Sequence, residues 1–460
     1  MASHSRPFVA ASLFVLASCA STTTASLSDA ELARAAAARQ SLDDVAAALR
    51  LADLGPLAVP VPRAPSELRP DQPEFWHAAA LAWNPELRQL RRRVRELRAE
   101  QGSAGAPGSV ELLAQTRDAG DLELESELAL TIDVLGVLGL GPAAAARELA
   151  RERSRAAFGE FEAAVWKLRF DVDRARVRLA RAKALAASMD ALYGECAEDE
   201  LRVRKLAERG WIGSGMQSGY DAALHMIEHR RAMAAADASE AKADLAELCG
   251  LDAAHAAFDE LAGGVIARFR PEELELRDPG REELLARLPE LRARRLELAM
   301  AEAELRAEAR ERWPMLRFGP RLTLMPGDSL LGGMLGIDVP FPGAVEGRIA
   351  AAHERREAAR EALEDALVNA SSNVTTARER LETLLEQFEE HAPEFDAEVA
   401  RMLVAAQAGF RVDGMTIDKL ALAIRERVES LTSLAQARAD AVIASLDYDE
   451  ARGVAAEVQP

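Results

Sequence analysis

Aromatic residues, long apolar runs and basic stripes are all scarce in this sequence. Only 5% of the 460 residues are aromatic, whereas alanine, leucine, glutamate and arginine are abundant, a mixture typical of long helices and coiled coils. No apolar stretch reaches the roughly 18 residues of a membrane-spanning helix. The net charge of −19 comes from interspersed acids and bases without a basic stripe, which argues against nucleic-acid binding and favours soluble, exposed helix faces.

Cysteine is scarce as well, with 3 in the chain. If a helical hairpin turns near residues 210–218, the residue opposite Cys196 lies near position 232. Cys249 then lies about 25 Å further along the helix, at 1.5 Å per residue. We therefore expect Cys196 and Cys249 to be buried and unpaired.

The second half of the chain repeats landmarks of the first half roughly 200 residues later. Three landmarks recur in the same order: Trp83–Arg88 as Arg287–Arg292, Ile132–Val134 as Ile337–Val339, and Gly210 with Gly215 as Gly409 with Gly414. A repeat of about half the chain indicates a pseudo-symmetric fold rather than a solenoid of short units. We expect two similar structural repeats, at 76–275 and 276–453, followed by a C-terminal tail at 454–460.

The N-terminus carries the features of a signal peptide. A short basic segment precedes an apolar run from Phe8 to Ala17 that is too short to span a bilayer. The run ends in Leu-Ala-Ser-Cys19, which resembles the bacterial lipoprotein box, whose cysteine is diacylated and becomes the first residue of the mature protein. We expect residues 1–18 to be removed, Cys19 to be lipidated, and residues 19–75 to form a linker. An ordinary signal peptide with a chance cysteine is the alternative.

Apolar residues at alternating spacings of three and four predict two long helical hairpins. Their seams run over 158–196 and 220–248 in the first half, and over 363–395 and 424–446 in the second half. The longest helices, at about 144–208 and 344–408, should each extend roughly 100 Å, and Pro393 should kink the second. Further expected elements are turns at 210–219 and 409–414 and short helices at 84–102 and 281–312.

Between the short and the long helices the apolar period changes to two. Apolar residues alternate with polar or small ones over about 122–134, 316–324 and 331–339, which predicts strands with one apolar and one polar face. A half-buried soluble sheet is the alternative for any single strand, but here each strand pair leads directly into a helix of roughly 100 Å. With one strand pair expected in each half, four strands per chain cannot close a barrel, because the smallest known barrels have about eight. A transmembrane barrel would therefore need several chains.

Taken together, these features resemble the outer-membrane factor family, the TolC-like channels of tripartite efflux systems. The resemblance covers about residues 76–453. The matched segments are Asn84–Leu87 and Leu288–Leu291 as helix starts, Ala301–Pro314 as a helix-to-strand approach, Ile337–Gly343 as a strand-to-helix turn, and Gly409–Asp418 as a hairpin tip. No single motif is highly specific, but their order, in duplicate and behind a lipoprotein box, is specific.

The resemblance implies a fold, a location and a function. The chain should be mainly α with a small β part, and three copies should form a twelve-stranded β-barrel in the outer membrane on a twelve-helix periplasmic tunnel, an α-barrel. The family's function is a passive exit channel of an RND-type tripartite efflux system. The hairpin tips, at Gly210, Gly215, Gly409 and Gly414, would contact a periplasmic adaptor that links the channel to an inner-membrane pump.

In the family's geometry the tips also bring carboxylates close to the threefold axis. The candidates for such a pore gate are Asp221, Asp413 and Asp418. Three copies of each would repel one another unless cations lie between them, so the closed end should prefer cations. The alternative is that Asp418 only caps the returning helix beside Thr416.

His225, Glu228 and His229 fit the H-x-x-E-H pattern of inverted zinc proteases. Zinc catalysis needs a third ligand and a shaped, dry cavity, whereas this motif lies about one turn past a hairpin tip on a thin coiled coil. We expect solvated or inter-helix histidines, with no resident metal and no catalytic residue, and keep adventitious metal binding as an alternative. No glycine-rich phosphate loop follows a strand, so no nucleotide or other cofactor is expected.

Two other functions are alternatives to a channel. A periplasmic adaptor also carries a coiled-coil hairpin, but a single one within a β-rich body, whereas this sequence predicts two. A degenerate TolC-like lipoprotein could act as a non-conducting scaffold or tether. The cargo is not encoded in any motif, because metal-ion, drug and peptide systems share this type of exit channel.

Overall fold

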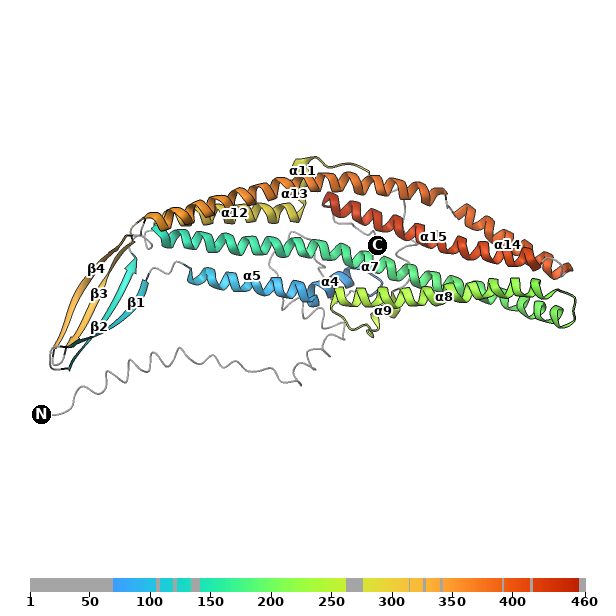
Figure 1. Cartoon of the computed structure of the whole chain (residues 1–460), viewed down its shortest axis with the longest axis horizontal. Coiled ribbons are helices and arrows are strands. Elements are labelled where there is room, and N and C mark those ends of the chain that lie inside the picture. The colour runs from blue at the N-terminus through green and yellow to red at the C-terminus, as the bar shows by residue number, and fades with distance from the viewer. Residues whose placement is uncertain are drawn as a thin grey trace.

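A computed structural model describes most of the chain between residues 69 and 454 (Figure 1). The described residues are 69–104, 108–118, 122–133, 141–261, 276–313, 315–325, 328–339, 342–390, 393–413 and 417–454. Residues 1–68, including Cys19, lie outside this part of the chain, as do Gly414 and residues 455–460.

The structure is elongated, with a small sheet at one end and helical hairpins extending to the other (Figure 1). The long helices are α7 (Gly141–Glu208), α8 (Ser214–Cys249), α13 (Pro342–Glu390), α14 (Pro393–Asp413) and α15 (Ile417–Arg452). The shorter helices are α4 (Pro73–Trp83), α5 (Pro85–Ser103), α9 (Ala257–Glu260), α11 (Arg281–Arg287) and α12 (Pro289–Arg310). With 68 residues, α7 extends about 100 Å at 1.5 Å per residue, as predicted. The expected mainly helical fold is therefore confirmed.

The sheet contains two hairpins that follow each other in the chain. Its strands are β1 (Gly108–Asp118), β2 (Leu122–Asp133), β3 (Met315–Met325) and β4 (Asp328–Asp338), in the order β1-β2-β3-β4. All neighbouring strands are antiparallel, and β2 and β3 join the hairpins through pairs such as Ile132 with Phe318. Each hairpin leads from a short helix, α5 or α12, to a long one, α7 or α13.

The apolar core consists of clusters spread along the helical body. One cluster joins α4 to α7 and α8, a second joins α5, α7 and α15, and a third joins α11 and the start of α12 to α13 and α15. A fourth cluster lies at the hairpin tips. Among the described residues, no helix has both the length and the apolar character needed to cross a membrane.

Helix α4 corrects the prediction that residues up to 75 form a linker. Phe75 and Trp76 are buried, and the Trp76 ring lies 5.1 Å from that of Phe258. The indole Nε1 of Trp76 donates to the carbonyl of Pro70 at 2.7 Å. Pro73 is in the first turn of α4, where a backbone N–H would have no acceptor within the helix, so its absence removes no hydrogen bond. The last proline of the proline-rich segment therefore begins a helix.

Two other predicted elements differ from the structure. The helix expected over 281–312 is split at Leu288 into α11 and α12, because the residue before a proline disfavours helical geometry. The turn expected at Gly409 does not occur there, since Gly409 lies inside α14 and the adjacent Phe410 is buried in the tip cluster. The interruption expected at Pro393 is confirmed, since α13 ends at Glu390 and α14 begins at Pro393.

Candidate functional site

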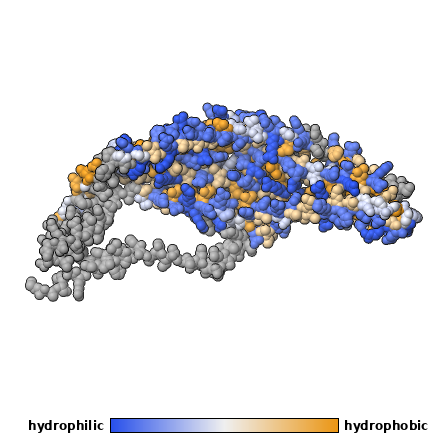
Figure 2. All heavy atoms as spheres, in the orientation of Figure 1, coloured by the Kyte–Doolittle hydropathy of each residue, from blue (hydrophilic) through white to orange (hydrophobic). Residues whose placement is uncertain are grey.

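The described part of β3 and β4 carries an uncovered apolar surface. Phe318 pairs with Leu335 across the hairpin, and Leu322 pairs with Leu331. Leu331 and Leu335 are 76% and 67% exposed, and Phe318, Ile337 and Val339 are exposed as well. Figure 2 shows hydrophobic residues gathered at this end, whereas the visible helical body is mostly hydrophilic. A contiguous apolar surface of this kind marks contact with a partner or with lipid.

The two helical hairpins meet at the opposite end of the molecule (Figure 1). Their tip cluster contains Tyr220 and Ile227 of α8 together with Ile417, Leu420 and Ile424 of α15, all fully buried. The hydroxyl of Tyr220 donates to the carbonyl of Cys196 at 3.1 Å. The tips of the two repeats are therefore packed into one unit within a single chain.

A polar contact reinforces this packing. Arg411 of α14 donates from Nε to Asp199 Oδ1 of α7 at 3.1 Å, and Asp199 is fully buried. The hydrogen bond to Asp199 and the charge of that carboxylate raise the pKa of Arg411. This ion pair links the first hairpin to the second, and the sequence did not single it out because an arginine and an aspartate more than two hundred residues apart share no local pattern.

The predicted tip glycines have different positions. Gly210 follows the end of α7 with a φ of +70°, a left-handed conformation that glycine adopts without strain. Gly215 is in the first turn of α8, whereas Gly409 is helical and Gly414 lies outside the described residues. Trp211 is 68% exposed beside Gly210, so the first tip presents an aromatic surface.

The predicted gate carboxylates lie on separate elements. Asp221 lines a polar cavity of about 260 Å³ in the first hairpin, beside Glu200 and Glu228. Asp418 is exposed in the first turn of α15, which is compatible with both a gate and a favourable contact with the helix dipole. Asp413 is the last residue of α14, and its side chain lies outside the described part. Within the described residues, no hydrogen bond or ion pair joins Asp221 to Asp418.

The histidine motif lies on an open face of α8. Nδ1 of His225 is 2.9 Å from Glu228 Oε2, and the side chains of His225 and Glu228 are both exposed. His229 is exposed on the same helix. In the described part of the chain, no group of three or more His, Cys, Asp or Glu side chains is arranged to hold a metal ion. The geometry is that of a solvated pair.

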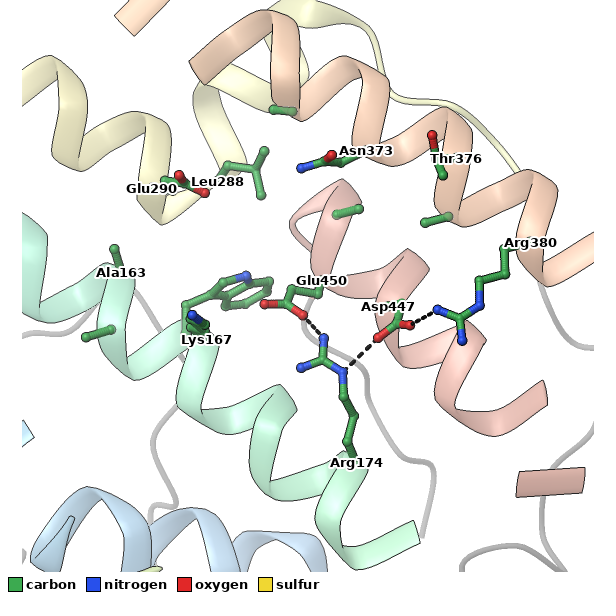
Figure 3. A pocket seen from close by; sticks show the side chains of 15 residues that line it. Ala163, Lys167, Arg174, Leu288, Glu290, Asn373, Thr376, Arg380, Asp447 and Glu450 are labelled. Atoms are coloured by element: carbon green, nitrogen blue, oxygen red, sulfur yellow. Dashed lines mark hydrogen bonds and ion pairs between the residues drawn. The ribbon is translucent and has the colours of Figure 1, made fainter. Parts of the chain in front are cut away.

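The sequence did not single out a cleft halfway along the helical body. This cleft has a volume of about 650 Å³ and is bordered by α7, α13, α15 and the start of α12 (Figure 3). Arg174 of α7 points between Asp447 and Glu450 of α15, with its Nε 2.7 Å from Asp447 Oδ1. Arg380 of α13 bonds the second oxygen of Asp447 at 3.3 Å.

The charges in this cleft tie the two halves of the chain together. Burial lowers the pKa of Arg174, but the carboxylates of Glu450 and Asp447 outweigh burial and raise it. Burial raises the pKa of Glu450 against the opposing effect of Arg174. In the sequence, Arg174 lies between Val172 and Ala175, two residues of the apolar seam over 158–196. A charged residue at the edge of such a seam is the sequence signal that could have pointed to this network.

A second internal polar cluster holds α4 in place. Nε2 of His77 lies 2.9 Å from Asp173 Oδ2, and Arg176 Nη1 lies 2.9 Å from Asp173 Oδ1. Burial opposes ionisation of Asp173, but His77 and Arg176 outweigh burial and lower the pKa of this carboxyl. Cys249 and Cys196 are both buried and free, as predicted.

Comparison with known proteins identifies the fold. No family model and no curated protein matches the chain. Solved structures do match: the outer-membrane channel OprN has a TM-score of 0.70 at 18% identity and covers 83% of this chain and 90% of its own. The fold is that of outer-membrane channels. The channel protein CusC has a TM-score of 0.68 at 16% identity and covers 87% and 97%. The CmeC outer membrane channel of Campylobacter jejuni has a TM-score of 0.67 at 13% identity and covers 87% and 91%.

At these identities the likeness concerns the fold, and at that level the predicted resemblance to TolC-like channels is confirmed. The similar structures are channel proteins rather than enzymes. This chain covers 90–97% of the length of these three structures.

Proposed function

We propose that this chain is one subunit of an outer-membrane exit channel, a passive conduit from the periplasm to the exterior in an RND-type tripartite efflux system. The observation that carries the proposal is the match in fold to outer-membrane channels over more than four fifths of the chain. Such a channel needs a contact with the membrane at one end and a contact with a periplasmic adaptor at the other. The exposed apolar surface of β3 and β4 would supply the first, and the joined hairpin tips would supply the second. We assign no enzymatic activity to it.

The proposed assembly is a homotrimer. One chain contributes four strands, and about eight is the smallest number that closes a membrane barrel. Three chains would supply twelve strands for a closed barrel and twelve helical segments for a periplasmic tunnel. The apolar face that includes Leu331 and Leu335 would then lie against lipid. The tips would dock on a periplasmic adaptor and, through it, on an inner-membrane pump.

The proposed anchor is a lipidated Cys19 in the periplasmic leaflet of the outer membrane. Cys19→Ala should leave the protein unacylated, which mass spectrometry of the N-terminal peptide would detect. Cys196→Ala is the matched control, because it removes a cysteine without touching the lipoprotein box. An unmodified wild-type N-terminus at another residue would contradict this assignment.

Assembly and conduction can be tested on the same purified protein. In detergent, mass photometry should give about three times the 49.7 kDa of the chain, less the signal peptides, and planar-bilayer recordings should give stepwise conductance. A stable monomer would refute the trimer. A trimer that inserts into the bilayer but never conducts would favour the non-conducting scaffold instead.

A further inference from the structure

A basic cavity lies between α5, α7 and α12, near the sheet end of the helical body. Its volume is about 580 Å³. The lining residues are Arg98 and Gln101 of α5, Arg151, Ser154, Arg155 and Phe158 of α7, and Leu296 of α12. No acidic residue is among them, although the chain as a whole has a net charge of −19.

The cavity is formed by one face of α7 and by the close approach of α12 to that helix. Ser154, Arg155 and Phe158 lie three, four and seven residues after Arg151, so the four residues share one face of α7. Helix α12 reaches that face because residue 159 is glycine: a Cβ there would lie 2.7 Å from Leu296 Cδ1. Phe158 and Leu296 therefore form an apolar side next to the arginines.

Each polar group of the cavity can donate hydrogen bonds, and its three arginines are exposed to solvent. Ser154 is only 6% exposed, and no hydrogen bond to its hydroxyl occurs in the described part of the chain. Arg151 likewise forms no ion pair with the described residues. The Arg98 guanidinium lies 5.5 Å from the centre of the Phe158 ring, which fixes its position. Only Arg155 is paired, with Glu152 at 2.7 Å.

We propose that this cavity binds a phosphate group. A phosphate offers only acceptor oxygens and negative charge, and the planar guanidinium forms two parallel bonds to it. The Ser154 hydroxyl and the Gln101 amide add neutral donors, and a bound phosphate would give the Ser154 hydroxyl a hydrogen-bond partner.

The position of the cavity allows two sources for the phosphate. Arg98 lies one to two turns before the end of α5, and Arg151 lies about 15 Å along α7 from its start, so the cavity is near the sheet end of the helical body. If the sheet lies in the membrane, as the proposed function requires, this is close to the head-group region. The phosphate could therefore belong to a lipid head group or to a soluble phosphate ester.

The test is a binding assay on the full-length protein in detergent, which does not depend on conduction or on assembly with other proteins. Inorganic phosphate is titrated by calorimetry, and native mass spectrometry is run after addition of phosphatidylglycerol or of phosphatidylcholine. Arg151→Gln should weaken phosphate binding about tenfold, the effect of losing one charge-assisted contact. Ser154→Ala should weaken it in the same direction by a smaller factor.

Arg153→Gln is the matched control, because Arg153 is exposed on α7, carries the same charge and does not line the cavity. Equal losses in Arg151→Gln and Arg153→Gln, or no phosphate binding by the wild type, would overturn the proposal. Retention of phosphatidylglycerol by the wild type and its loss in Arg151→Gln would assign the phosphate to lipid. If the wild type binds inorganic phosphate but retains no phosphatidylglycerol, the natural ligand is a soluble phosphate ester and the lipid source is refuted. Melting temperatures without phosphate verify that the variants are folded.

Discussion

Removing the Asp173 carboxylate should release α4 from the helical body. Asp173 is buried and accepts one bond from His77 of α4 and one from Arg176, each at 2.9 Å. A hydrogen bond to a charged group contributes about 1.5–3 kcal/mol. Breaking a buried pair costs about 3–5 kcal/mol, because the remaining charge stays uncompensated. Arg176 is 1% exposed and would be that charge in Asp173→Ala.

Hydrogen–deuterium exchange of the α4 amides measures this effect directly. At about 1.4 kcal/mol per factor of ten, Asp173→Ala should speed their exchange roughly a hundredfold to a few thousandfold. Because the pKa of Asp173 is lowered in the folded protein, its contribution is fully present above the ordinary carboxyl pKa. It is lost only as the pH falls through the lowered value. The variant should therefore differ from the wild type throughout the neutral range.

Two further variants make the reasoning refutable. Asp171→Ala removes a more exposed carboxylate two residues before Asp173, paired with Arg174 at 2.8 Å, and should change the hydrogen exchange of α4 less than about fivefold. Asp173→Leu combined with Arg176→Met removes both charges and should restore much of the protection. If Asp171→Ala and Asp173→Ala act equally on α4, apolar packing alone holds this helix and the ion cluster does not.

Three further predictions concern other parts of the chain. Gly250→Ala should lower the melting temperature by several degrees, because Gly250 has a φ of +63° and a Cβ would lie 2.5 Å from the carbonyl oxygen of the last residue of α4, whereas Gly280→Ala should be neutral. Burial raises the pKa of the Cys196 thiol to about 12, so maleimide should label it only after denaturation; labelling of the native protein near pH 8 would contradict this. The double variant Asp413→Ala and Asp418→Ala should reduce cation selectivity and divalent-ion block in planar bilayers, and unchanged values would leave Asp418 only its role at the start of α15.

The regular part of the fold could be predicted because it depends on periodicity. The seam from Phe158 to Cys196 predicted α7, and the period of two predicted β2, β3 and β4 but not β1, since both patterns follow from which face of an element is buried. The break before Pro393 followed from the chemistry of proline. These features are local, and one sequence is enough to see them.

The missed features depend on contacts between distant segments. The alanines of α4 are too small to mark an apolar face, and only packing of Phe75 and Trp76 on α7 and α8 makes this segment helical. The sequence predicts a turn at Gly409 because glycine is about 1 kcal/mol less favourable than alanine inside a helix. In the structure Gly409 is helical, and burial of the adjacent Phe410 offsets this cost. The ion pairs of Arg174 and Arg411 join residues from opposite halves of the chain, so a local pattern could at most mark one partner, as the charge of Arg174 beside its seam does, and never the pairing.

Helix α4 also sets the reach of the proposed lipid anchor. His77 contacts Asp173, which lies about 50 Å along α7 from the sheet end of that helix. Between Cys19 and the start of α4 there are roughly 50 residues, whose contour length of up to about 170 Å is more than three times that distance. This length is more than enough to join a lipid at Cys19 to the docked helix. A deletion of about 20 residues between them should therefore leave both lipidation of Cys19 and the docking of α4 intact.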